Sequence, residues 1–243
     1  MLILLLAASA TTLATGLGAV PVFFLRGQAT VWEPLLWGLA AGVMVVAAIV
    51  GLLKPAFDEG SELAVAVGLA AGITFLILAR ALLQGSDVHV RNLRGASVRT
   101  SVLVFSVLTV HSLPEGFAIG TAYASDVAGL SLFVILAIGV QNIPEGTSVA
   151  IPMSEAGFSR SEQFWAAVLT SAPQPIGAAI AYLLVETIQG LLGVSFAFAA
   201  GAMLALVVTD LLPPALRARG WRGPLGLLTG AAIMLALSAA LSV

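Results

Sequence analysis

The chain has 243 residues, of which 60% are hydrophobic and 9% are charged, and its mean hydropathy of +1.09 lies far outside the range of soluble domains. This composition predicts an integral membrane protein whose main partner is the lipid bilayer. The net charge of −2, with basic residues scattered among apolar runs, excludes a nucleic-acid-binding face. The absence of cysteine excludes disulfides, thiolate metal sites and thiol nucleophiles.

A membrane-spanning helix needs about 20 largely apolar residues, and the chain divides into eight such segments. The predicted spans are 2–25, 34–57, 62–83, 100–124, 128–151, 162–186, 189–211 and 223–242. The first has no positively charged n-region and its apolar run is long, which favours a retained helix over a signal peptide. No interval has room for a soluble domain, so we expect one all-helical transmembrane domain over residues 1–243.

The basic residues predict the orientation, because Lys and Arg near helix ends are retained on the cytoplasmic side. An extracytoplasmic N-terminus leaves only Lys54 outside. It puts nine basic residues at cytoplasmic helix ends or loops: Arg26, Arg80, Arg91, Arg94, Arg99, Arg160, Arg217, Arg219 and Arg222. An even number of spans returns the chain to its starting side, so we expect both termini to be extracytoplasmic.

Three residues before the fourth span are weak candidates for metal binding. The interval between the third and fourth spans carries Asp87 and His89, which could capture or release a metal ion. A solvated loop is the simpler interpretation, because no His-rich tract accompanies them. Met44 is a single Met in the apolar second helix, which by itself is typical of core packing.

The fourth and fifth spans carry two related segments, HSLPEGFAIG and QNIPEGTSVA. In the first, His111 and Glu115 are four residues apart and therefore share a helix face. Gln141 and Glu145 have the same spacing in the second. A carboxylate at bilayer depth costs from a few to about ten kcal/mol or more, so two of them predict a bound cation. The alternative is a satisfied hydrogen-bond network that fixes helix packing.

Each segment also contains a proline, Pro114 or Pro144, which removes a backbone donor and bends its helix beside the polar residues. The connection between the two spans is short, so they form an antiparallel pair. We therefore expect a metal site between kinked helices four and five. Imidazole favours Zn, Fe, Ni or Cu, carboxylate extends the range to Mn, and a thioether favours softer ions such as Cd.

The sixth and seventh spans each add one polar candidate. Gln174 lies between Pro173 and Pro175, so the sixth helix is expected to bend around the same site, with packing polarity as the alternative role for Gln174. Asp210 ends the seventh span. It either marks the cytoplasmic mouth of a metal pathway or is an interfacial residue offset by nearby arginines, Arg217 and Arg219.

Together these segments resemble the ZIP (Zrt/Irt-like protein) family of divalent metal transporters, especially its bacterial members. The resemblance rests on TTLATGLGAVP in the first helix, AGVM in the second, HSLPEG and QNIPEG, PQPIGAA in the sixth and FAAGAMLALVVTDLLP in the seventh. It implies a protein of the inner membrane with eight helices and both termini on the extracytoplasmic side. It also implies a binuclear site between helices four and five. The first metal position it implies consists of Met44, His111, Glu115, Gln141 and Glu145.

The sequence departs from the family at the second metal position. Family members often have Asn, an acid and Glu where this chain has Ser112, Asn142 and Gln174. Two cations close together repel, and fewer anionic ligands offset that repulsion poorly, so we expect one principal metal site. The resemblance also implies uptake toward the cytoplasm, with Zn²⁺ the first candidate and Cd²⁺, Fe²⁺ or Mn²⁺ open. It further implies that helices one, four, five and six move against two, three, seven and eight.

An enzyme is not expected. An intramembrane metalloprotease needs a second helical histidine, as in H-E-x-x-H, and the sequence has no such motif. A serine protease needs a nucleophile turn such as G-x-S-x-G, which is also missing. The metal is thus a transported ion and not a cofactor. A metal- or proton-conducting channel and a transport-impaired homologue stay open as alternatives, as do proton coupling and a homodimer.

Overall fold

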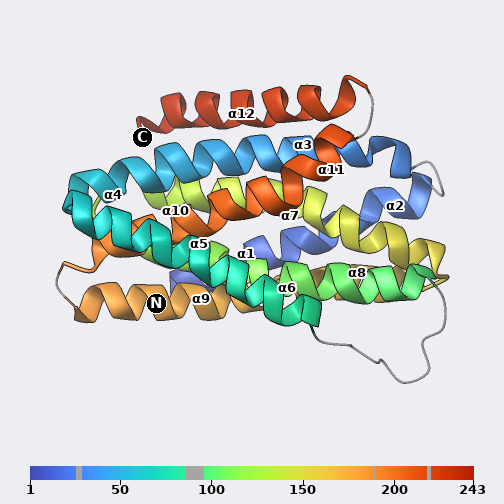
Figure 1. Cartoon of the computed structure of the whole chain (residues 1–243), viewed down its shortest axis with the longest axis horizontal. Helices are drawn as coiled ribbons and strands as arrows, with labels where there is room; N and C mark the ends of the chain where they lie inside the picture. Colours follow the sequence, from blue (N-terminus) through green and yellow to red (C-terminus); the bar gives the residue numbers. More distant parts are fainter. Residues whose placement is uncertain (26–28, 86–95, 189, 218–219) are drawn as a thin grey trace.

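The chain folds into a bundle of long helices (Figure 1). The computed structural model describes residues 1–25, 29–85, 96–188, 190–217 and 220–243, with backbone alone at 25, 29, 83–85 and 96–108. Within these ranges the α-helices are α1 (Leu2–Leu17), α2 (Ala19–Leu25), α3 (Ala29–Val46), α4 (Lys54–Glu59), α5 (Glu62–Gly85), α6 (Ala96–Ala124), α7 (Leu130–Glu155), α8 (Arg160–Thr170), α9 (Pro173–Thr187), α10 (Leu192–Leu206), α11 (Leu212–Arg217) and α12 (Arg222–Leu241).

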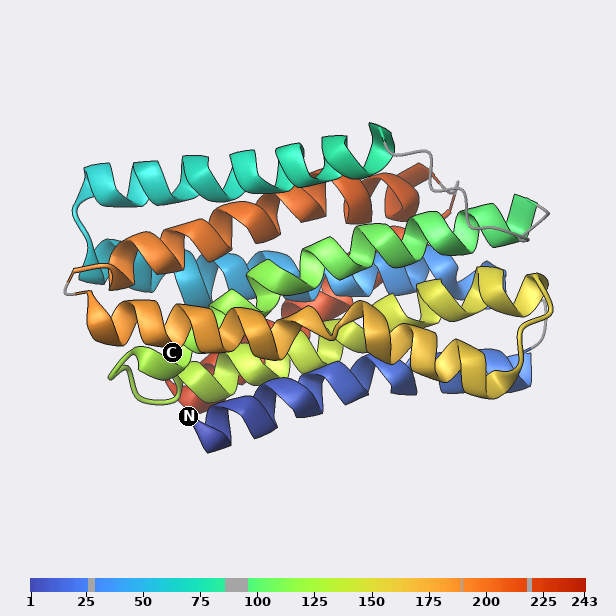
Figure 2. The same ribbon diagram turned by 90° about the horizontal axis from the view of Figure 1, so that it is seen from below.

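These helices form the eight predicted spans. Among the described residues, seven helical stretches are long and apolar enough to cross a membrane, and α6 runs beside them as the eighth span. Both termini lie at the same end of the bundle (Figures 1 and 2). The all-helical membrane fold expected from the sequence is confirmed.

Four spans are composite, which the apolar pattern did not predict. The first is divided at Gly18 and the sixth at Ser171 and Ala172, before the prolines of α9. The second and seventh contain π-helical turns, Ala47–Leu53 and Val207–Leu211. Such turns are rare inside α-helices, and those that do occur are often at functional sites.

The seventh span also ends later than predicted. We expected it to stop at residue 211, before Pro213 and Pro214, but α11 carries it to Arg217. The two prolines fall in the first turn of α11, where a missing backbone N–H leaves no helical hydrogen bond unmade. The predicted end of this span at residue 211 was therefore too early.

The most extensive helix packing divides the bundle into two groups. In the first helix group (α1, α2 and α6–α9), α6 packs on α9 and α1 packs on α7. In the second helix group (α3–α5 and α10–α12), α3 packs on α12 and α5 packs on α10. Figure 2 shows α5 and α10 along one edge and α1 along the opposite edge. The first group contains both predicted metal-binding helices.

Glycines allow the closest helix approaches inside each group. In the first group, a Cβ added at Gly146 would lie 1.7 Å from the carbonyl oxygen of Thr15. In the second group, a Cβ at Gly42 would lie 2.1 Å from the carbonyl oxygen of Leu227. Across the boundary, a Cβ at Gly51 would instead meet the side-chain ring of Phe133. Backbone-to-backbone packing is therefore tightest within the groups.

We predict that Gly146→Ala lowers the free energy of unfolding by about 3 kcal/mol, because its methyl group would overlap the α1 backbone. The matched control is Gly139→Ala in the same helix, where the nearest atom, Thr11 Cγ2, lies 3.9 Å from the added Cβ. That control should be near neutral. Thermal unfolding of the purified proteins in detergent measures both, and equal losses would contradict this account of the α1–α7 contact.

Candidate metal centre

The four polar side chains of the HSLPEG and QNIPEG segments are buried at the facing surfaces of α6 and α7. His111, Glu115, Gln141 and Glu145 are each at most 3% exposed. The Gln141 Nε2 atom donates a hydrogen bond of 2.8 Å to Glu115 Oε1 and so links the two helices. The hydrogen bond joins Glu115 of α6 to Gln141 of α7, and His111 and Glu145 lie one helical turn from them; these four residues are called the centre below.

Several atoms of this centre have no hydrogen-bond partner in the described part of the chain. They are His111 Nδ1, Gln141 Oε1 and Glu145 Oε1. Buried polar atoms are nearly always paired, and unpaired ones call for an explanation such as an ion. A nitrogen lone pair, an amide oxygen and a carboxylate oxygen are all donors to a divalent transition metal.

The centre is not a cluster of acids and histidines alone. Within the described ranges, no three His, Asp or Glu side chains come together as a possible metal site. His111, Glu115 and Glu145 therefore do not form a metal-binding cluster by themselves, and a divalent ion held here needs neutral donors as well. The amide oxygen of Gln141 is one such donor.

A second polar network adjoins Glu115 and consists of amides and hydroxyls. Gln174 Nε2 donates to Glu115 Oε2 at 2.7 Å and to Asn142 Oδ1 at 3.2 Å. The Gln174 Oε1 atom in turn accepts hydrogen bonds from Thr11 Oγ1 at 2.8 Å and from Asn142 Nδ2 at 3.2 Å. Asn142 Nδ2 also donates to the Thr11 carbonyl oxygen at 2.7 Å. Both amides are thus engaged through their oxygen and their nitrogen.

Ser112 hydrogen-bonds to the backbone where the sixth span is interrupted. Its hydroxyl donates to the Thr170 carbonyl oxygen at 2.8 Å, and Thr12 Oγ1 donates to the Ser171 carbonyl oxygen at 3.1 Å. Ser171 is four residues before Pro175, which has no N–H to donate to it. Hydroxyls from α6 and α1 therefore satisfy carbonyls at the break, and the predicted irregularity of the sixth helix lies beside the centre.

Asp210 is placed in the π-helical turn of the seventh span, and its partner differs from the expected one. Arg80 Nη1 of α5 lies 2.9 Å from Asp210 Oδ1 and 3.0 Å from Asp210 Oδ2. The sequence predicts Arg217 and Arg219 as offsetting charges, because they are close in sequence, and Arg219 lies outside the described residues. Among the described residues Arg80 is the paired arginine, because α5 packs along α10. Asp210 Oδ2 also lies 3.8 Å from His111 Nε2.

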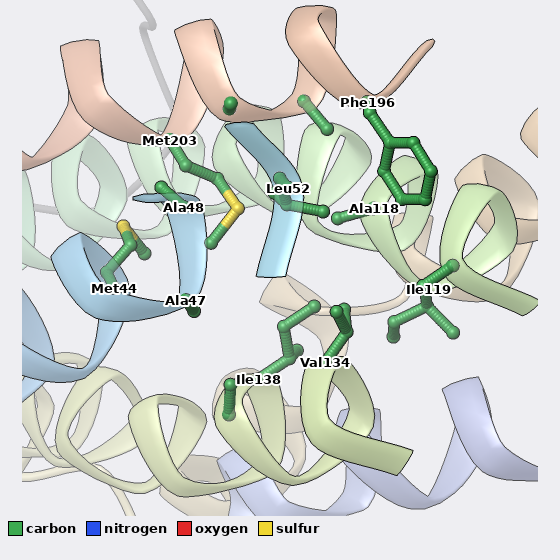
Figure 3. Packing of buried hydrophobic residues seen from close by; sticks show 14 of the residues in the cluster. Met44, Ala47, Ala48, Leu52, Ala118, Ile119, Val134, Ile138, Phe196 and Met203 are labelled. Carbon is green, nitrogen blue, oxygen red and sulfur yellow. The ribbon is translucent and has the colours of Figure 1, made fainter. Parts of the chain in front are cut away.

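Met44 is fully buried on α3, in an apolar cluster at the boundary between the two helix groups. Figure 3 shows it with Ala48 and Leu52 of its own span, near Met203 of α10 and Ile138 of α7. Since α3 packs directly on α7, Met44 lies on a helix adjoining the centre. Its role as a ligand stays a prediction. His89, the other candidate, lies outside the described residues.

Two contributors were missed from the sequence. Thr11 was not singled out, although a Thr-Thr pair in an apolar helix signals polar neighbours. Arg80 was used only to orient the chain, although a charge three or more residues inside a predicted span demands a buried partner. Both signals were present, but the partners come from helices distant in sequence.

Comparison with known proteins identifies the family. A family model described as ZIP Zinc transporter matches residues 80–238. The chain belongs to the ZIP family. The ZIP chain is 32% identical to the zinc transporter ZupT of Corynebacterium glutamicum over 247 residues, which are 91% of this chain and 92% of that protein. It is 31% identical to the zinc transporter GufA of Myxococcus xanthus, over 82% of this chain and 83% of the relative.

A plant relative extends beyond this ZIP chain. An Arabidopsis thaliana protein named for a proposed zinc transport role is 37% identical over 207 residues, which are 84% of this chain but 33% of the plant protein. The chain therefore spans about a third of that relative and most of the bacterial ones. The resemblance noted from the sequence motifs is confirmed.

Proposed function

We propose that this ZIP transporter moves Zn²⁺ toward the cytoplasm and carries it at one principal site. The ZIP family and the zinc transporters related to this chain support divalent metal transport. The proposed ligands are Met44, His111, Glu115, Gln141 and Glu145. Two ionised glutamates would balance the charge of one divalent ion, and transport without chemistry at the metal makes zinc the substrate.

The observation that carries the single-site proposal is the contrast between the two polar networks. The unpaired atoms belong to His111, Gln141 and Glu145, which are first-position residues. At the second position, the Gln174 amide nitrogen donates hydrogen bonds to the second oxygen of Glu115 and to the side-chain oxygen of Asn142. A second cation would have to break those bonds and gain only neutral amide donors, against repulsion from the first cation.

The proposed movement is a displacement of the first helix group against the second. The helices inside each group approach through glycines, whereas the boundary around Met44, Ala48 and Ile138 is lined by apolar side chains (Figure 3). Apolar surfaces lose no directional hydrogen bonds when they slide, so this boundary favours motion more than the group interiors do. The centre would travel with the first group.

The proposed direction rests on charge placement. The helix α4, which begins at Lys54, lies at the end of the bundle that carries both termini (Figure 1). The first residue of α8, Arg160, and the last residue of α11, Arg217, belong to helix ends on the opposite side. The positive-inside rule makes the arginine end cytoplasmic. We therefore propose extracytoplasmic termini in the inner membrane, with metal leaving past Asp210 at the arginine end.

Uptake of radioactive zinc into proteoliposomes tests the proposal. A carrier should show saturable uptake that is lost in His111→Ala, and crystals soaked in zinc should show one anomalous peak between α6 and α7. Flux that rises without saturation would favour a channel instead. Zinc binding without uptake would identify a transport-impaired homologue, and two fully occupied peaks would contradict the single site.

Met44→Ala provides a more specific test, because a thioether favours softer ions. We expect it to weaken Cd²⁺ binding by about tenfold, or 1.4 kcal/mol, and to weaken Zn²⁺ binding less. Met203→Ala is the matched control, since Met203 is equally buried in the same apolar cluster. Competition binding in detergent measures both. Equal effects of the two substitutions would show that Met44 acts through packing.

A further inference from the structure

An ion pair between Arg80 and Asp210 lies beside His111, one of the proposed ligands, and is not itself part of the principal site. Arg80 contacts both carboxylate oxygens of Asp210, at 2.9 and 3.0 Å. Thr209 Oγ1 donates to Asp210 Oδ2 at 2.6 Å, and the same oxygen lies 3.8 Å from His111 Nε2. His111 therefore faces Asp210 with one ring nitrogen, while its other nitrogen, Nδ1, lacks a hydrogen-bond partner among the described residues.

The spacing of these groups suits a metal ion. Zinc lies about 2.0–2.2 Å from nitrogen and oxygen ligands, so an ion bound to Asp210 Oδ2 would lie directly beside His111, whose Nε2 atom is 3.8 Å from that oxygen. The Asp210 side chain is 17% exposed and that of Arg80 is 30% exposed, whereas His111 is buried. The pair of possible ligands thus connects the buried centre with a more accessible position toward the arginine end.

Arg80 and Asp210 belong to the same helix group, and His111 belongs to the other. The α5–α10 contact that brings Arg80 to Asp210 is tight: a Cβ added at Gly72 would lie 2.0 Å from the Phe198 carbonyl oxygen, and one at Gly201 would lie 2.4 Å from that of Leu69. A displacement between the groups would change the Asp210–His111 distance and leave the Arg80–Asp210 pair intact. The pair is therefore opened by competition from another cation and not by the movement itself.

We propose that Arg80 is a tethered cation that occupies Asp210 and prevents the departing metal ion from being held there. This inference rests on the proposed function, because it concerns metal that leaves the principal site. A free aspartate on the path of the departing ion would bind zinc and slow its release. With Arg80 in place, the metal ion must displace a guanidinium whose Nη1 atom donates to Oδ2 and contacts Oδ1, so the ion is held at Asp210 only briefly.

Removing the tethered cation should create a site that binds zinc. Purified Arg80→Gln in detergent, equilibrated with zinc alone, is expected to bind one more zinc ion per chain than the unsubstituted protein. The double variant Arg80→Gln/Asp210→Asn should lose this additional ion. Arg217→Gln is the matched control, because Arg217 is exposed at the same end of the bundle, and it should bind the same amount of zinc as the unsubstituted protein.

A transport measurement separates this role from a structural one. Zinc uptake into proteoliposomes should fall about tenfold in Arg80→Gln, because zinc is retained, and should recover in part when Asp210→Asn is added. A merely structural ion pair predicts no gain of zinc and no recovery. Equal zinc binding by Arg80→Gln and the unsubstituted protein, or an additional ion that persists in the double variant, would overturn the inference.

The zinc counts distinguish a failure of the principal site from a failure of this inference. If the unsubstituted protein binds no zinc and Arg80→Gln binds one ion that depends on Asp210, the principal site fails, although Arg80 still keeps zinc from Asp210. If both proteins bind one ion, the role of Arg80 fails and the principal site stands.

Discussion

Glu145→Gln should weaken zinc binding by more than about a hundredfold and abolish saturable uptake. Loss of outer partners of metal ligands already costs roughly 10–100-fold, and this substitution removes one of the two carboxylates that would balance the ion. Glu145 is 2% exposed, and its Oε1 atom has no hydrogen-bond partner among the described residues. A neutral amide at this buried position needs less solvation than a carboxylate, so folding should survive.

Thermal unfolding with and without zinc distinguishes ligand loss from misfolding. The unsubstituted protein should gain about 2.7 kcal/mol of stability when free zinc is 100 times its Kd. Glu145→Gln should keep the stability of the metal-free protein and show little of this gain. Glu155→Gln is the control, since Glu155 is exposed at the end of the same helix. Unchanged zinc affinity in Glu145→Gln would remove Glu145 from the site.

The eight spans could be predicted because an apolar run must be long enough to cross the bilayer, whatever it packs against. Most of their internal breaks could not, and the exception is the sixth span, where Pro173 and Pro175 predict a bend. Proline usually ends a helix, yet Pro213 and Pro214 follow a π-helical turn and lie inside the seventh span. Whether proline stops or only interrupts a helix depends on which neighbours satisfy the freed carbonyls, as Ser112 and Thr12 do at the sixth span.

The principal centre was predictable for a related reason. A four-residue spacing fixes the shared face of His111 and Glu115 within one helix, and the short connection brings the second pair alongside. The contacts of Asp210 were not predictable in this way, because Arg80 is 130 residues away and reaches it through the packing of α5 on α10. Thr11 was hidden for another reason: a threonine in a helix usually bonds its own backbone, and Thr11 does so at the Ala8 carbonyl oxygen as well as bonding Gln174.

The two polar networks share one residue, and this makes their separation testable. Glu115 accepts from Gln141 on one carboxylate oxygen and from Gln174 on the other. The first oxygen accepts from Gln141, whose own amide oxygen has no hydrogen-bond partner among the described residues. The second oxygen accepts from Gln174, whose amide is fully hydrogen-bonded. An N–H group of Gln174 points to Glu115, where a second metal ion would otherwise bind. Replacing this amide with a carboxylate should therefore change the position from one that repels a cation to one that binds it.

Gln174→Glu should therefore create a second zinc site. Without metal, the introduced carboxylate would face Glu115 and lose the donor bonds to Glu115 and Asn142, so the metal-free protein should be less stable by roughly 1–3 kcal/mol. With zinc, two carboxylates would flank a second ion. We expect one zinc ion more per chain than in the unsubstituted protein, and a larger zinc-dependent rise in the unfolding temperature.

The matched control is Gln163→Glu, a glutamine that is also buried but lies in α8 with its Nε2 donating to the Phe158 carbonyl oxygen. It should lower stability without adding a zinc ion, which separates the general cost of a buried carboxylate from the gain of a ligand. Equilibrium dialysis gives the number of bound ions, and anomalous scattering gives their positions. A Gln174→Glu protein that still binds one ion, at the unsubstituted position, would show that something other than the missing carboxylate prevents a second metal. The neutral amides of Gln174 and Asn142 would then be a feature of helix packing, and the number of sites would be set by the repulsion between two ions across Glu115 and Glu145.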